Sequence, residues 1–409
     1  MRFCIHAHPT DLVALGEGGG HARLAGLGFQ ELTIELCDDG FERIPSHAAA
    51  SPRGSSAGEL WFRPSGDYQA LRPKVAQDAP PEELDLFAKH ADQCREHGLS
   101  ARALLRPLTS AAHAQNEPRF AVVDALGRRH ASRLCPSHPA VFDYARWLVA
   151  DVAEQTGLET LELAGLGFPG PEFGPTKLRT ADRVDPAVAF LLSVCFCAEC
   201  AASMERTGIG SASLRKKVVR LIHERLSTRD VLAPRPSLSI EEHFRTLETE
   251  LGHAGMFAIW SHRLGTYLRL LKAFRSEIAG RTRLAVHVHF HSLFAGDGLG
   301  APLPALHGHA DEWIVANFEE TPQALAQAWR SESLRGRPVR AGITPHPPWY
   351  RSTDDVYLAR TAVEEAGGAG LVVRSLGLLP WPTLERVAAI LRDASGVRKG
   401  VKPRPPARR

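Results

Sequence analysis

Short runs of apolar residues alternate with longer amphipathic stretches along most of the chain. Runs of about four to eight residues rich in Val, Ile and Leu are typical of buried strands, whereas apolar residues at every third or fourth position are typical of helices. Eight runs have the strand pattern: 3–8, 31–37, 101–109, 158–165, 283–291, 312–318, 338–344 and 369–376. Helical patterns occupy 21–29, 80–98, 138–157, 213–227, 239–278 (one long helix or two), 353–367 and 381–394.

Eight strands with intervening helices predict a parallel sheet. We expect residues 1–395 to form a single closed (β/α)8 TIM-type barrel, with a long loop insertion around 38–76 and a helical insertion around 165–280. An open doubly wound sheet is the alternative. The segment GEGGGH (16–21) follows a strand but does not complete the dinucleotide-binding fingerprint, so it predicts a loop at the barrel mouth and no organic cofactor.

Charge does not point to nucleic acid. The net charge is +3, but the segment 396–409 carries six basic residues and no acidic one, which leaves +3 − 6 = −3 for the rest of the chain. That Pro-rich basic tail is typical of a disordered appendage. The stretch MRFCIHAHP lacks the charged region and long apolar run of a secretory signal, so we expect no such signal. No apolar run approaches the roughly 18 residues of a membrane helix, and the cysteine count is odd, so we expect a cytoplasmic protein. The oligomeric state stays open.

The segment VHVHFH places His287, His289 and His291 on one face of a predicted strand, because side chains alternate between faces. If the barrel closes as expected, the aliphatic face packs on the helices and the histidines point inward. His289 and His291 would then lie near the mouth, and His287 deeper.

Polar side chains also gather at the carboxyl ends of the other predicted strands, where (β/α)8 barrels place their reactive groups. Burying ionisable groups is costly unless they are paired or used, so these ends predict a functional site. The candidate substrate-binding residues are His6, His8, Glu35, Arg106, Lys177, His287, His291, Asn317, His346, Trp349 and Arg374.

A metal-dependent hydrolase is one interpretation of these histidines. The His6-x-His8 pair resembles the first strand of amidohydrolase-type enzymes, and His8, Glu162 and His289 or His291 could bind zinc. That family needs an aspartate at the last strand, where this chain has Arg374, and a cation beside a metal is unfavourable. The alternative is that the histidines bind one another, the backbone and the substrate.

The cysteine cluster in LSVCFCAEC indicates a separate metal site. Cys195, Cys197 and Cys200 place three thiols within six residues, which suits a structural, tetrahedral zinc ion. The fourth ligand must come from elsewhere in the chain. We expect Cys135, with His138 as the second candidate; the alternative is that the thiols are buried singly.

The segment SRLCPSHPAVFDYARWLVADVAEQTGLETLELAGLGFPG, followed by CFCAEC, resembles a stretch of glycoside-hydrolase-like (β/α)8 proteins. In those proteins a CP-x-x-P element precedes a helix, the next strand ends in an acidic residue, and a Cys-x-Cys-x-x-Cys cluster often follows. The resemblance covers roughly residues 100–200. It implies a barrel with a general site and does not identify a substrate.

By this resemblance, Glu162 matches the acidic residue at the end of the fourth strand. A glycosidase needs a second carboxyl group, for which Glu319, Glu172 and Glu35 are candidates. We therefore expect Glu162 and Glu319, with His289, to act on a sugar or sugar-like small molecule.

Three alternatives remain open at this point. Glu162 could be a structural carboxylate neutralised by Arg106 or Lys177. The barrel could be a metal-dependent hydrolase or lyase, or it could bind a carbohydrate or a partner without catalysis. Of the tryptophans, Trp349 in the loop TPHPPWY is the expected sugar-stacking platform.

Overall fold

The computed structural model describes residues 1–14, 19–38, 40, 42–43, 46, 53–54, 56–76, 84, 86–156, 158–169, 186–228, 240–278, 280, 282–288, 306, 308–316, 318, 321–329 and 338–393. The predicted tail 396–409 lies outside these residues. No helix in the described part of the chain is long and apolar enough to cross a membrane.

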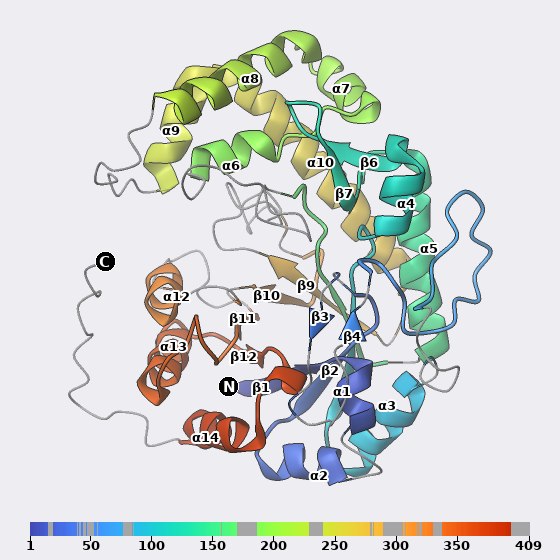
Figure 1. Cartoon of the computed structure of the whole chain (residues 1–409), viewed down its shortest axis with the longest axis vertical. Helices are drawn as coiled ribbons and strands as arrows, with labels where there is room; N and C mark the ends of the chain where they lie inside the picture. The colour runs from blue at the N-terminus through green and yellow to red at the C-terminus, as the bar shows by residue number, and fades with distance from the viewer. Residues whose placement is uncertain are drawn as a thin grey trace.

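Eight parallel strands close into a barrel, which confirms the predicted (β/α)8 class (Figure 1). The strands are β1 (Arg2–Ala7), β2 (Glu31–Glu35), β5 (Ser100–Leu105), β8 (Thr160–Leu163), β9 (Arg283–Val288), β10 (Glu312–Val315), β11 (Val339–Ile343) and β12 (Gly370–Val373). They follow one another around the barrel in chain order, and β12 pairs with β1 to close it. Each of the eight predicted runs therefore forms one barrel strand.

Helices cover the outside of the barrel (Figure 1). Those near the barrel are α1 (Pro9–Ala14), α2 (Gly19–Gly26), α3 (Leu86–Glu96), α5 (Pro139–Thr156), α12 (Pro322–Trp329), α13 (Thr353–Glu365) and α14 (Trp381–Arg392). Helix α13 begins with a capping box in which Ser352 and Asp355 bond to each other's backbone N–H groups. Alternate strand residues such as Ile5, Ile34 and Leu163 face these helices in one large apolar core.

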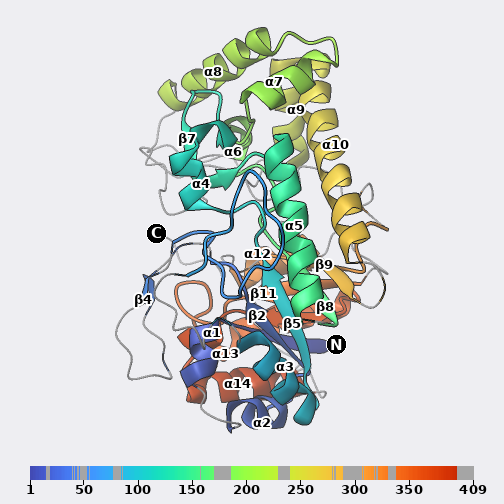
Figure 2. The same ribbon diagram turned by 90° about the vertical axis from the view of Figure 1, so that its right-hand side faces the viewer.

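A second layer of helices lies beyond the carboxyl ends of the strands (Figures 1 and 2). It contains α4 (Ala111–Asn116), α6 (Pro186–Leu192), α7 (Ala198–Glu205), α8 (Ser211–Ser227), α9 (Ile240–Leu251) and α10 (His253–Glu277), together with the antiparallel pair β6 (Ala121–Val123) and β7 (Arg129–Leu134). The predicted stretch 239–278 forms two helices because Gly252 adopts φ = 79°, a left-handed conformation that ends α9. Helix α10 packs along α5 and leads directly into β9.

The predicted loop around 38–76 contains little regular structure where it is described. It includes two strands of two residues each, β3 (Glu42–Arg43) and β4 (Arg53–Gly54), which pair with each other. Leu60 forms isolated bridges with Cys37 and Val75, and Trp61 N–H donates to the carbonyl of Leu36. These bonds attach one part of the loop to the carboxyl end of β2, beside the barrel mouth.

Candidate functional site

The centre of the barrel is polar. Glu162 on β8 is fully buried and directs its carboxylate Oε2 at two imidazoles, with Nε2 of His6 at 3.1 Å and Nε2 of His287 at 3.0 Å. Strands β8 and β9 are neighbours, but β1 lies across the barrel, so the three side chains meet in its interior. Because a carboxylate oxygen can only accept, both Nε2 atoms carry hydrogen in this arrangement.

The other oxygen of Glu162 is held from the opposite side. Oε1 accepts a hydrogen bond from the hydroxyl of Thr33 at 2.7 Å and one from Nε of Arg102 at 2.6 Å. The carboxylate therefore has four donors and a fixed orientation.

Arg102 also anchors an ion network toward the amino ends of the strands. Its two terminal nitrogens lie 3.1 Å from Oε2 of Glu31 and 2.7 Å from Oε1 of Glu312. Arg340 binds the same two carboxylates, at 2.9 Å for Glu31 and 3.0 Å for Glu312. These groups are all buried and mutually paired, as buried charges must be.

The network determines the protonation of Glu162. Burial raises the pKa of its carboxyl group, but Arg102 and the hydrogen bonds from the two histidines outweigh burial and hold the pKa well below the usual range. Burial lowers the pKa of His287 to about 4, although its bond with Glu162 acts in the opposite direction. At neutral pH the site thus contains an ionised carboxylate beside a neutral imidazole.

A second histidine–carboxylate pair lies nearer the mouth. Nε2 of His8 lies 2.8 Å from Oδ1 of Asp38, and its Nδ1 lies 2.9 Å from the hydroxyl of Thr10. Trp61 donates its indole N–H to the other oxygen of Asp38 at 2.5 Å, and its ring meets the His8 ring edge-on with 4.6 Å between centroids. The loop after β2 thereby fixes His8 at the end of β1.

Phe318 packs against the central histidines. Its ring centroid lies 5.7 Å from that of His6 and 6.0 Å from that of His287, and Arg374 lies over the same ring at 5.5 Å. A Cβ atom at Gly342 would lie 2.5 Å from the Phe318 ring, so the absence of a side chain on β11 creates the space for it. An aromatic side chain therefore occupies part of the barrel interior next to Glu162.

The predicted site residues divide into three groups. His6, Glu162 and His287 meet directly, while Glu35 and Arg106 form a neighbouring buried ion pair at 3.5 Å. His346 and Trp349 lie after β11, where Nδ1 of His346 contacts the carbonyl of Pro347 and Trp349 packs against the main core. The remaining candidates, Lys177, His289, His291, Asn317 and Glu319, and the alternative Glu172, lie outside the described residues.

Two important residues, Arg102 and Trp61, were not among those predicted from the sequence. Arg102 pairs with Glu162, whereas the sequence hypothesis named Arg106 or Lys177, of which Lys177 lies outside the described residues. Arg102 lies on β5, four positions before Arg106, which directly follows that strand, so the alternation that turns Arg106 inward also predicts an inward Arg102. Asp38 and Trp61 belong to an aperiodic loop, and no sequence signal pairs them with His8.

The four predicted cysteine ligands come together in the helical layer. Sγ of Cys135 lies 3.4 Å from that of Cys200, 3.5 Å from that of Cys197 and 4.0 Å from that of Cys195. A tetrahedral zinc ion with Zn–S bonds of about 2.3 Å requires S···S separations of about 3.8 Å, which these distances bracket. The four thiols are buried and free, and the cluster could hold a metal ion.

The fourth member is Cys135, as predicted, and not His138. His138 instead packs edge-on against Phe120 and accepts the backbone N–H of Ala140. Backbone N–H of Val123 donates to Sγ of Cys195 at 3.4 Å. The cluster joins the end of β7 to the α6–α7 connection.

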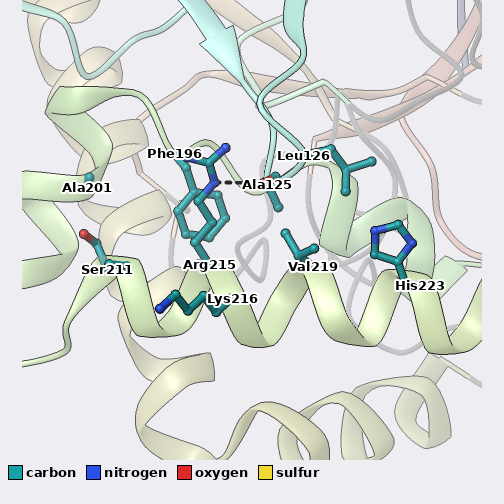
Figure 3. A pocket seen from close by; sticks show the side chains of 10 residues that line it. Ala125, Leu126, Phe196, Ala201, Ser211, Arg215, Lys216, Val219 and His223 are labelled. Carbon is teal, nitrogen blue, oxygen red and sulfur yellow. Dashed lines mark hydrogen bonds between the residues drawn. The ribbon is translucent and has the colours of Figure 1, made fainter.

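A cavity of about 710 Å³ lies elsewhere, between α8 and the β6–β7 connection (Figure 3). Leu126, Phe196 and Val219 line its apolar part, and Arg215 and His223 contribute nitrogen groups. Its described lining contains no carboxyl group, so it does not suit carboxylate-dependent chemistry.

Comparison with known proteins identifies the fold and leaves the family open. No family model matches the chain, and no curated protein matches it in sequence. Its structure is similar to the glycoside hydrolase domain of PgaB (BpsB) from Bordetella bronchiseptica, with a TM-score of 0.59, 12% identity and coverage of 96% of this chain and 99% of that one.

Two other solved structures show the same likeness. The catalytic domain of β-amylase from Paenibacillus polymyxa has a TM-score of 0.54, 10% identity and coverage of 97% and 98%. The α-L-fucosidase isoenzyme 2 from Paenibacillus thiaminolyticus has a TM-score of 0.53, 11% identity and coverage of 96% and 49%. The expected resemblance to glycoside-hydrolase barrels is thus confirmed at the level of the fold.

Proposed function

We propose that the protein is a glycoside-hydrolase-like enzyme that acts on a sugar or sugar-like small molecule at the carboxyl-terminal mouth of the barrel. The observation that supports this most is the buried Glu162, whose pKa is held well below its usual range and whose carboxylate accepts hydrogen bonds from two imidazoles. The structural neighbours support the reaction class, because several are glycoside hydrolases.

In this proposal Glu162 is the negative charge that the reaction needs and not its proton donor. Glycoside hydrolysis passes through a positively charged, oxocarbenium-like state, which a fixed carboxylate stabilises. The low pKa of Glu162 disfavours it as a general acid, so the acid would be a second carboxyl group, with Glu319 after β10 as our candidate. His6, His287 and, in our proposal, His289 would hold the substrate between the two.

The test is a screen of the purified protein against aryl glycosides of both anomers, read by release of the phenol and of reducing sugar, with Glu162→Gln as the inactive reference. The proposal expects release from at least one glycoside by the wild type only. If a calorimetrically detected sugar ligand binds but no glycoside is cleaved, the protein is a carbohydrate-binding barrel without catalysis.

A metal-dependent hydrolase or lyase is the second candidate. It is favoured by the convergence of one ligand atom each from His6, Glu162 and His287, a histidine–carboxylate set that zinc accepts. Arg102 weighs against it, because its cationic Nε already lies 2.6 Å from the same carboxylate. Reversible loss of turnover on chelation would support this candidate over the first.

We also propose that the ion suited to the four cysteines is zinc, in a structural role. Cys135, Cys195, Cys197 and Cys200 would fill all four positions of a tetrahedral ion and leave none for a substrate. Because every cysteine is a free thiol, we place the protein in the reducing cytoplasm.

A further inference from the structure

The surroundings of the cysteine cluster carry an unexplained positive charge. Arg263 on α10 is 4% exposed, and none of the described carboxylates forms an ion pair with it. Its terminal nitrogen donates to the hydroxyl of Ser193 at 2.7 Å, and its guanidinium lies 4.9 Å from the ring centroid of Phe190 and 5.6 Å from that of Phe168. A hydroxyl and two aromatic faces do not neutralise a buried cation.

The segment that Arg263 contacts through Ser193 also carries cysteines, and the negative charges of Cys195 and Cys200 would act on Arg263 together with that of Tyr267. Ser193 precedes Cys195 by two residues, and burial lowers the pKa of Arg263 while the charges of Tyr267, Cys195 and Cys200 raise it. Four neutral thiols would give Arg263 no counter-charge. Four thiolates around one divalent ion carry a net charge of −2, which the low polarity of the site makes strongly attractive to a guanidinium.

Other contacts of α10 surround the same cluster. Arg269 donates to the carbonyl of Pro136, next to Cys135, and it too has no ion pair with a described carboxylate. His262 contacts the hydroxyl of Ser137 at 3.3 Å, and that hydroxyl lies 3.4 Å from Sγ of Cys200. One face of α10 therefore presents hydrogen-bond donors and positive charge to the segments that hold the thiols.

We propose that Arg263 is the counter-ion of a divalent metal bound as a tetrathiolate by Cys135, Cys195, Cys197 and Cys200. Metal binding is then coupled to the packing of α10 on the segments that hold these cysteines. This inference rests on the metal site proposed above. Since α10 leads into β9, which carries His287, the metal centre fixes the helix that precedes a strand of the candidate site. Groups that support a metal centre from outside its ligands commonly change its affinity by about 10- to 100-fold.

The experiment compares the zinc affinity of the reduced wild type with three variants, by competition with a chromophoric chelator. Arg263→Met removes the charge but keeps an unbranched side chain, and Arg263→Lys keeps the charge. Arg360→Met is the matched control, because Arg360 is equally buried on α13 but has Glu364 and backbone carbonyls as partners. We expect about 10- to 100-fold weaker binding for Arg263→Met only.

The outcomes separate the two proposals. A wild type that binds no zinc refutes the metal site itself. A wild type that binds zinc and an Arg263→Met variant of the same affinity refute the counter-ion alone. If Arg263→Met does not fold, amide hydrogen exchange of the wild type with and without zinc tests the coupling instead. Removal of zinc should increase the exchange rate of the amides of α10 around Arg263 and leave that of the amides of α13 around Arg360 unchanged. Unchanged exchange in α10 overturns the coupling.

Discussion

Arg102 donates from Nε to Oε1 of Glu162 at 2.6 Å, in the closed interior of the barrel. The bond ties the candidate site to the ion network below it, because the same guanidinium also binds Glu31 and Glu312. The charge state of Glu162 is therefore a property of the folded barrel and is present before any substrate binds.

The first prediction concerns the pH dependence of stability. The folded-state pKa of Glu162 is depressed, so its stabilisation is fully present above the unfolded-state pKa of about 4.3 and is lost as the pH falls through the lower folded-state value. Glu162→Gln should lower the free energy of unfolding by about 3–5 kcal/mol at pH 7, since it breaks a buried pair. Urea unfolding of both proteins at neutral and acidic pH measures this, and a difference that does not shrink in acid would contradict the assignment.

The second prediction concerns the space for Phe318. Gly342→Ala places a Cβ atom against the Phe318 ring, which is itself packed on His6 and His287, so the free energy of unfolding should fall by about 1–3 kcal/mol. Gly265→Ala is the control, because this exposed position within α10 has no atom within 4 Å of the added Cβ. That substitution should stabilise the protein by up to about 1 kcal/mol. Equal changes in the free energy of unfolding for the two substitutions would show that the Phe318 ring can move away from a side chain at position 342.

The barrel was predictable because its strands are buried on both sides and bounded by polar turns, so each appears as a distinct run in the sequence. The inward direction of His287 followed from alternation along β9, and Cys135 followed from its position before a strong helix. The elements α4 and β6 were missed because they contain too few residues to establish a period, and β7 (RHASRL) was missed because few of its residues are apolar. Contacts such as that between Trp61 and Asp38 depend on the path of a long loop, which local sequence does not determine.

The third prediction concerns metal content. Elemental mass spectrometry of the reduced protein should find one zinc ion per chain, lost in Cys197→Ser and kept in Cys94→Ser, because Cys94 is a buried cysteine outside the cluster. Thiol titration after denaturation with a chelator should count all seven cysteines. A count of three would mean that the cluster is two disulfides, and metal retained in Cys197→Ser would place an ion at His6, Glu162 and His287.

The fourth prediction concerns His287. Its imidazole is neutral at physiological pH, because burial lowers its pKa to about 4. In nitrogen-resolved NMR, the Nε2 atom of His287 should carry the hydrogen from pH 6 to 8, and this preference should weaken in Glu162→Gln because the accepting oxygen loses its charge. A hydrogen on Nδ1 in the wild type would contradict the bond to Glu162.

The most direct test of the account compares the turnover of Glu162→Gln and Glu312→Gln on a glycoside that the wild type cleaves. The two substitutions are matched, because each removes the charge of a buried carboxylate that binds Arg102, but only Glu162 faces His6 and His287. With both variants folded, we predict that kcat/KM falls at least about 100-fold for Glu162→Gln and stays within about tenfold of the wild type for Glu312→Gln. Near-wild-type turnover in Glu162→Gln, or equal losses in the two variants, would contradict the assignment of Glu162 to the active site.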